Sequence, residues 1–150
     1  MQRVLVRLTP GVEAVTHQAI ATAHDESKFG LGADDALAAI DGGMSDNPRP
    51  QLYGARYEAL LAERADELAT GVYRVAGKHC ESGDVLIDAA ELPRPERGDL
   101  LAVPATGAYT LSLSSNYHGV PRPAVVLVGG GAATVIRRRE AVEDLLRYEG

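Results

Sequence analysis

Short apolar runs separated by turn residues dominate the carboxy-terminal two thirds of the sequence. Five such runs, each bounded by Gly, Pro or Asp, lie at residues 72–75, 85–89, 100–103, 124–128 and 133–138. Runs of this length and spacing are typical of strands in an antiparallel β domain. The pattern therefore predicts that this part of the chain is mainly β.

The first fifty residues follow a different order of patterns. Residues 3–8 alternate apolar residues with arginine, which predicts one strand. Residues 33–40 are rich in alanine and leucine and carry two aspartates near their start, which predicts a short helix. Gly, Ser, Asp, Asn and Pro predominate at residues 41–50, which predicts a loop.

Two later segments show helical spacing. In residues 57–68, Leu60, Leu61, Ala65 and Leu68 carry helical spacing. In residues 140–147, Val142, Leu145 and Leu146 fall on one helical face, which predicts a short terminal helix.

Composition narrows the functional classes. The chain has 150 residues, of which 45% are hydrophobic, enough for one compact domain core. Its net charge is -6 and no basic stripe is present, so nucleic acid is not an expected partner. Cys80 is the only cysteine, which excludes an internal disulfide and fits a reducing, cytoplasmic setting. The first residues contain no long apolar run, so neither a signal peptide nor a membrane span is expected.

Two further patterns resemble ligand sites but have simpler explanations. Residues 129–131 are three glycines, yet a strand-like run follows them rather than a helix, so a hairpin turn is expected instead of a phosphate loop. His17 and His24 are seven residues apart, which is not the spacing of metal ligands on one helical face. No metal site is predicted.

A candidate anion-binding group lies in the loop that ends near residue 50. Arg49 stands between Pro48 and Pro50, and Tyr53 follows four residues later. Prolines stiffen the backbone, and a guanidinium can bind a carboxylate through two parallel hydrogen bonds. On spacing alone, a solvated arginine in a turn is the commoner case.

A second group combines a thiol with a carboxylate. Cys80 and Glu81 are adjacent, after His79, in a turn-forming segment. A thiolate can act as a nucleophile and a thiol as a proton donor, although a lone cysteine is more often a small buried apolar residue. Tyr109 follows two small residues that would let backbone approach a ligand, but a core tyrosine fits equally well.

Three segments together carry a family resemblance. They read DGGMSDNPRPQLY at 41–53, KHCESGD at 78–84 and ATGAYTLSLSSNY at 105–117. In this order they resemble the carboxy-terminal part of the diaminopimelate decarboxylase family, pyridoxal-phosphate enzymes of lysine biosynthesis. The resemblance implies an alanine-racemase-type C-terminal β-barrel or sandwich domain, with a strand at residues 57–62. It also implies a homodimer that converts meso-diaminopimelate to lysine and carbon dioxide.

The resemblance assigns roles to five residues. Arg49 and Tyr53 would hold the distal end of diaminopimelate, and Tyr109 would line the cofactor site. Glu81 would meet the distal amine of the substrate and Cys80 would serve proton transfer, both reaching across the dimer interface. Asn116 and Tyr117 end the third family-like segment and are assigned to packing.

The resemblance is discontinuous. Residues 3–37 resemble one strand-and-helix stretch of the family's barrel domain, with Val15 where a histidine is expected, and residues 40–150 resemble the end of the barrel and the β domain. We therefore expect a barrel remnant at 1–40, a β domain at 41–150 and an internal deletion near residues 39–41.

The cofactor expectation depends on lysine. Pyridoxal phosphate acts as an electron sink once an amine has formed a Schiff base with it. Lys28 and Lys78 are the only lysines, and neither fits the family's cofactor motif, whose lysine is expected upstream of Met1. We predict that the isolated chain neither retains the cofactor nor decarboxylates. The alternative is a non-catalytic dimerisation or interaction module, or a truncated product.

Overall fold

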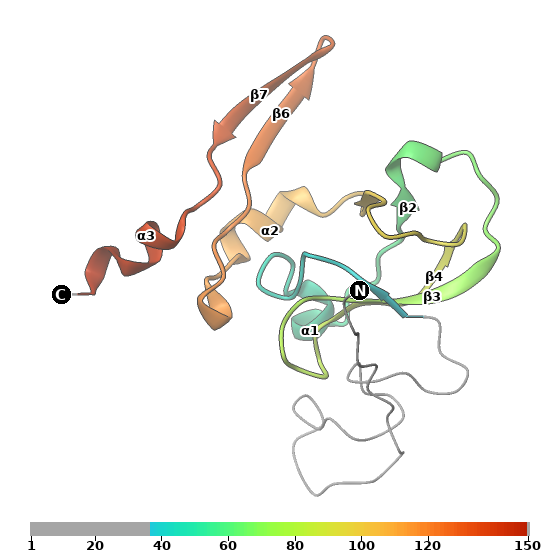
Figure 1. The fold of residues 1–150 in the computed structure, drawn as a ribbon, viewed down its shortest axis with the longest axis horizontal. Coiled ribbons are helices and arrows are strands. Elements are labelled where there is room, and N and C mark those ends of the chain that lie inside the picture. The colour runs from blue at the N-terminus through green and yellow to red at the C-terminus, as the bar shows by residue number, and fades with distance from the viewer. Residues whose placement is uncertain (1–36, 150) are drawn as a thin grey trace, which may run out of the picture.

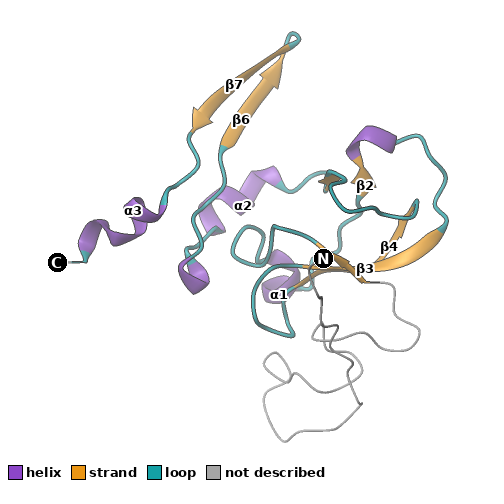
Figure 2. Ribbon diagram, in the orientation of Figure 1, coloured by secondary structure: helices purple, strands orange, loops and turns teal. Residues whose placement is uncertain are grey.

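The computed structural model describes residues 37–149, and most of their regular structure is β (Figure 2). The strands are β1 (Leu37–Ala39), β2 (Leu60–Leu61), β3 (Gly71–Ala76), β4 (Val85–Leu92), β5 (Leu101–Ala102), β6 (Val125–Gly129) and β7 (Ala132–Arg137). The α-helices are α1 (Arg49–Tyr53), α2 (Gly107–Leu113) and α3 (Val142–Leu145). Three 3₁₀ helices are η2 (Ala62–Arg64), η3 (Tyr117–Gly119) and η4 (Leu146–Tyr148).

The described strands form three separate sheets. In the largest, β3 pairs in parallel with β1 on one side and antiparallel with β4 on the other. β2 pairs with β5, and β6 pairs with β7, both antiparallel. The prediction of a mainly β fold is confirmed, whereas a closed barrel is not formed by the hydrogen-bonded strands of residues 37–149.

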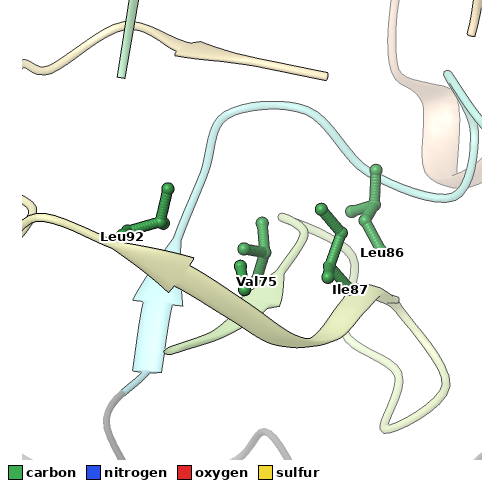
Figure 3. Close-up of a cluster of buried hydrophobic side chains, with 5 residues drawn as sticks. Val75, Leu86, Ile87 and Leu92 are labelled. Atoms are coloured by element: carbon green, nitrogen blue, oxygen red, sulfur yellow. The ribbon is translucent and has the colours of Figure 1, made fainter. Parts of the chain in front are cut away.

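The core lies against β3 and β4 (Figure 3). Its buried members, drawn there as sticks, are Val75, Leu86, Ile87, Ala90 and Leu92. Leu86 and Ile87 are consecutive but both buried, which breaks the usual alternation of a strand. Register shifts on either side of Val75 in the paired strand accompany this break, as β-bulges do.

The helix predicted at residues 33–40 is wrong where the structure describes it. Leu37–Ala39 forms strand β1, and the next residue, Ile40, donates its N–H to the Ala76 carbonyl at 3.0 Å. Ala38 and Ile40 also pack against the core. Pairing with β3 and burial therefore outweigh the helical propensity of alanine and leucine. The remainder of that segment and the predicted strand at 3–8 lie outside the described residues.

Other elements match the predictions with shifted ends. The five runs that opened the sequence pattern all contain strands, and the terminal helix is present as α3 followed by η4. The strand expected at 57–62 is confirmed only as Leu60–Leu61. The loop expected through residue 50 ends earlier, because Arg49 begins α1 with Pro50 in its first turn, a position that proline favours. Residues 107–113 form helix α2, which the sequence pattern did not indicate.

The hairpin of β6 and β7 extends away from the core sheet, as does α3 (Figure 1). Its turn is Gly130 and Gly131, with φ of 56° and 74°, a left-handed pair that matches the twist of a two-residue hairpin. The interpretation of the three glycines as a turn is confirmed. Leu127, Val128 and Ile136 on the two strands are exposed. No helix within residues 37–149 has the length and apolarity needed to cross a membrane.

Glu140 fastens the base of this hairpin to the rest of the chain. Its carboxylate accepts hydrogen bonds from the Arg122 backbone N–H at 2.9 Å and from the Asn116 amide at 2.7 Å. Arg137, on β7, donates to the same carboxylate at 3.0 Å. The backbone N–H of Arg122, the Asn116 amide and the Arg122 charge lower the pKa of Glu140 to about 2.

The lowered pKa of Glu140 predicts that the stability of the fold depends on pH. The pKa of Glu140 falls from 4.5 to about 2 on folding, so its contribution is complete above pH 4.5 and is lost as the pH drops towards 2. We expect Glu140→Gln to remove roughly 1–3 kcal/mol at pH 6 and much less at pH 2. Urea unfolding followed by circular dichroism at both pH values measures this, with the exposed Glu143→Gln as control. An equal loss at both pH values would contradict the assignment.

Candidate functional site

Three segments of the candidate site meet at a buried polar hub, which consists of Ser45, His79 and Asp84. Asp84 is fully buried and accepts the backbone N–H groups of Met44 and His79, both at 2.7 Å. The His79 ring nitrogen Nε2 lies 2.8 Å from the Ser45 hydroxyl. The Ser45 carbonyl accepts the backbone N–H of Ser115 at 2.9 Å. The hub thus joins the loop before α1, the turn at residues 77–84 and the loop after α2.

Two glycines make room for the hub. A Cβ atom on Gly77 would lie 2.4 Å from both carboxylate oxygens of Asp84. A Cβ atom on Gly43 would lie 2.7 Å from His79 Cδ2 and 3.0 Å from Asp84 Oδ2. Contacts this short cannot be accommodated by a buried side chain without moving it. The glycines therefore permit the close approach of the first two segments.

Arg49 and Tyr109 are brought together by α1 and α2. The Arg49 guanidinium lies 5.3 Å from the centroid of the Tyr109 ring, within the range of a cation–π contact. Arg49 Nη1 also donates to the Tyr57 hydroxyl at 3.2 Å. Arg49 is half-buried, and Tyr109 is 60% exposed, so the interpretation of Tyr109 as a core residue is wrong. No sequence spacing indicated the contribution of Tyr57.

Tyr53 is the last residue of α1, four positions after Arg49, and its side chain is 67% exposed. That spacing places the two side chains on the same face of a helix. The helix ends there because Gly54 adopts a left-handed conformation with φ of 62°. Tyr53 is thus available to a ligand beside Arg49.

Glu81 lies against two aromatic side chains from η3. Its carboxylate accepts a hydrogen bond from the Tyr117 hydroxyl, and its Oε1 lies 3.5 Å from His118 Nε2. The rings of Tyr117 and His118 are 4.3 Å apart, and both lie near His79. The assignment of Tyr117 to packing alone is therefore incomplete, because its hydroxyl orients a candidate site residue. His118 was not indicated by the sequence pattern, since its contact depends on a turn in which it adopts a positive φ of 58°.

Cys80 is exposed, so the interpretation of this residue as a small buried apolar side chain is wrong. It precedes Glu81 in the turn that the hub holds. The turn itself is closed by hydrogen bonds from the Glu81 N–H to the His79 carbonyl at 2.9 Å and from the Asp84 N–H to the Glu81 carbonyl at 3.1 Å. The thiol is therefore presented to solvent from an ordered turn.

A cleft of about 830 Å³ lies between α1, β4 and the turn at residues 77–84. Among the five predicted site residues, Glu81 alone lines it. Arg56, Arg74 and Asp88 add charge to its wall, and Val85, Leu86 and Ile87 add apolar surface. The cleft is large enough for a small molecule. Arg49 and Tyr109 do not line it, although Arg49 donates to the hydroxyl of Tyr57, which does.

The described residues do not fit pyridoxal phosphate. Lys78 is their only lysine, and its Nζ is paired with Asp46 Oδ2 at 3.4 Å. The glycine turn at residues 130 and 131 belongs to an open hairpin, with no helix after it to bind phosphate. Residues 37–149 also contain no grouping of His, Cys, Asp and Glu side chains that would hold a metal ion.

Comparisons with known proteins agree with the family resemblance of residues 41–53, 78–84 and 105–117. Residues 12–107 match the family described as pyridoxal-dependent decarboxylase, C-terminal sheet domain. The chain is 50% identical over 143 residues to the diaminopimelate decarboxylase of Actinosynnema pretiosum subsp. auranticum, an alignment that covers 95% of this chain and 32% of that protein. It is 50% identical over 111 residues to the diaminopimelate decarboxylase of Bacillus subtilis, covering 74% of this chain and 25% of that protein.

Solved structures show the same likeness. A crystal structure of a diaminopimelate decarboxylase superposes with a TM-score of 0.72 at 34% identity, over 88% of this chain and 32% of that one. The Helicobacter pylori diaminopimelate decarboxylase complexed with L-lysine gives a TM-score of 0.71 at 32% identity, over 88% of this chain and 30% of that one. The chain therefore spans about a third or less of the length of the relatives that it matches.

Proposed function

Because the chain belongs to the family of pyridoxal-dependent decarboxylases that contain the C-terminal sheet domain, we propose that it carries the diaminopimelate-binding loops of a diaminopimelate decarboxylase. The observation that supports this most is the presence of Arg49 and Glu81 on two segments fastened by one buried hub. Each end of diaminopimelate bears an ammonium and a carboxylate. The Arg49 guanidinium of one chain and the Glu81 carboxylate of its partner, each held in a fixed place, would be the complementary groups.

Each predicted site residue takes a role that suits its place. Arg49, steadied by Tyr57 and Tyr109, would bind the distal carboxylate with Tyr53 beside it. Glu81, oriented by Tyr117, would reach across the dimer interface and bind the distal ammonium of the substrate held by Arg49 of the partner chain. Cys80 would serve as a proton donor, for which an exposed thiol in an ordered turn is suited. Tyr109 would border the cofactor in a complete active site.

The isolated chain is proposed not to decarboxylate. Pyridoxal phosphate supplies the electron sink for this chemistry when it is bound. Lys78, held by Asp46, is not placed as an anchoring amine, and its backbone N–H is bonded to the Gly42 carbonyl at 3.0 Å. The division into a barrel remnant at 1–40 and a β domain at 41–150, with an internal deletion between them, stays a prediction, as does a cytoplasmic setting.

We expect the purified chain to form no lysine from meso-diaminopimelate in the presence of pyridoxal phosphate. Amino-acid analysis after long incubation measures the product, with the Bacillus subtilis enzyme as the positive control. Borohydride treatment should leave no cofactor bonded to Lys28 or Lys78. Lysine formation would contradict this expectation, and a cofactor adduct mapped to either residue would favour an enzyme over a non-catalytic module.

A non-catalytic interaction module is the second candidate function. It is favoured by the β6–β7 hairpin, where Leu127, Val128, Val135 and Ile136 are all exposed. A lone two-stranded hairpin is only marginally stable in water, and its free edges can pair with another strand. We propose that a second copy of the chain covers it, giving a homodimer. Sedimentation equilibrium distinguishes a monomer from a homodimer. A monomer mass at all concentrations would count against this module.

A further inference from the structure

We propose that Asp84 is a positioning residue that sets the relative placement of the three segments carrying the candidate site. It acts through the backbone of the first two of these segments. The inference rests on the proposed function in assigning substrate binding to these segments. The positioning itself rests only on contacts within the chain.

The two carboxylate oxygens of Asp84 bind different parts of the site. Oδ1 accepts the Met44 N–H, in the loop that leads to Arg49, and Oδ2 accepts the His79 N–H, in the turn that carries Cys80 and Glu81. Both donors lie 2.7 Å away. An ionised carboxylate is an acceptor only, so it can satisfy both N–H groups, whereas an amide must turn its NH₂ group towards one of them.

The third segment is connected through the residue that Asp84 fixes. The His79 ring reaches the Ser45 hydroxyl at 2.8 Å, and the Ser45 carbonyl accepts the Ser115 N–H at 2.9 Å. Two residues after Ser115, the Tyr117 hydroxyl donates to Glu81. These contacts form a closed circuit that begins and ends in the turn at residues 77–84.

Burial makes this use of an aspartate informative. Asp84 is fully buried, and a carboxylate removed from water is costly unless hydrogen bonds compensate for its lost hydration. A turn could be closed by a neutral side chain at lower cost. The charged group gains its advantage by holding two separate backbone segments at once, and binding groups need placement to within a fraction of an ångström.

Distance measurements between spin labels test the proposal without any ligand. Cys80 is the only cysteine, so one label attaches there, and a second attaches to Leu52→Cys, an exposed position on α1. We expect Asp84→Asn to broaden the distance distribution roughly twofold, because the two segments lose a shared acceptor. Asp99→Asn is the matched control, since Asp99 also accepts a backbone N–H, from Glu96 at 2.8 Å, in a turn outside the hub.

A second variant covers the case in which Asp84→Asn does not fold. Ser45→Ala removes only the contact with the His79 ring, and a label at Leu111→Cys on α2 replaces the one at position 52. Broadening between positions 80 and 111, with an unchanged circular dichroism spectrum, is the expected result. The proposal is wrong if the Asp84→Asn variant folds and keeps the distance distribution of the control. If Asp84→Asn does not fold, the same result for Ser45→Ala would show that the proposal is wrong. If the variants show the expected broadening but the unaltered chain does not bind diaminopimelate, the proposed function is wrong and the positioning role of Asp84 still holds.

Discussion

Replacing Gly77 with alanine is expected to lower the free energy of unfolding by about 3 kcal/mol or more, because the new methyl group and the Asp84 carboxylate cannot both be accommodated. The added Cβ would lie 2.4 Å from each carboxylate oxygen. Relieving that overlap requires Asp84 to release the backbone N–H of Met44 or His79. A buried carboxylate with fewer hydrogen bonds is itself strongly destabilising. Urea unfolding followed by circular dichroism measures the change.

The control for this variant is Gly129→Ala. Gly129 ends β6, and a Cβ atom there meets nothing within 4 Å. Alanine at this position should change stability by less than about 0.5 kcal/mol. A Gly77→Ala variant as stable as Gly129→Ala would mean that Asp84 does not occupy the hub.

The second large effect is expected on ligand binding. Glu81→Gln keeps the shape of the side chain and an oxygen for the Tyr117 hydroxyl but removes the charge that would meet the distal ammonium. Hydrogen bonds to charged groups contribute about 1.5–3 kcal/mol, so affinity for meso-diaminopimelate should fall roughly 10- to 100-fold. Arg49→Met should weaken binding to a similar extent by removing the group for the distal carboxylate. Calorimetric titration measures both losses.

Glu91→Gln is the matched control for the Glu81 variant, because Glu91 is an exposed residue of β4. Its affinity should equal that of the unaltered chain. Equal affinities for Glu81→Gln and Glu91→Gln would remove Glu81 from the binding site, while a loss confined to Arg49→Met would restrict recognition to the carboxylate end.

Strands were predictable from the sequence because their information is local. The runs at β3, β4, β6 and β7 are apolar and bounded by turn residues, and burial or pairing of such runs leaves few alternatives. Leu37–Ala39 shows where local information fails. Its composition favours a helix, but pairing with β3, more than thirty residues away, decides its structure.

The candidate site also contains residues that the sequence indicated and residues that only the fold brings together. The family-like wording identified Arg49, Glu81 and Tyr109, and the structure brings Arg49 and Tyr109 together across sixty residues. The sequence resemblance did not indicate that Tyr117 and His118 would lie against Glu81. Those contacts arise from the folding of loops that are distant in sequence, and no spacing rule reports them.

The hub was also invisible to the sequence pattern. The sequence pattern gives His79 and Asp84 no role of their own, whereas the structure buries both and places Ser45 beside the His79 ring. No sequence pattern distinguishes Gly43 and Gly77, the two glycines that permit this arrangement. Their importance follows from what a Cβ atom would meet in the folded chain.

We propose that this chain binds diaminopimelate through the three segments that meet at the hub without decarboxylating it. Titration of the isotopically labelled chain with meso-diaminopimelate, followed by nuclear magnetic resonance, tests this most directly. We expect saturable shifts at Arg49, Glu81 and Tyr117, with the ligand recovered unchanged. A folded chain whose signals at these residues do not move, even at ligand concentrations of about 10 mM, where weak specific binding would still register, would contradict it.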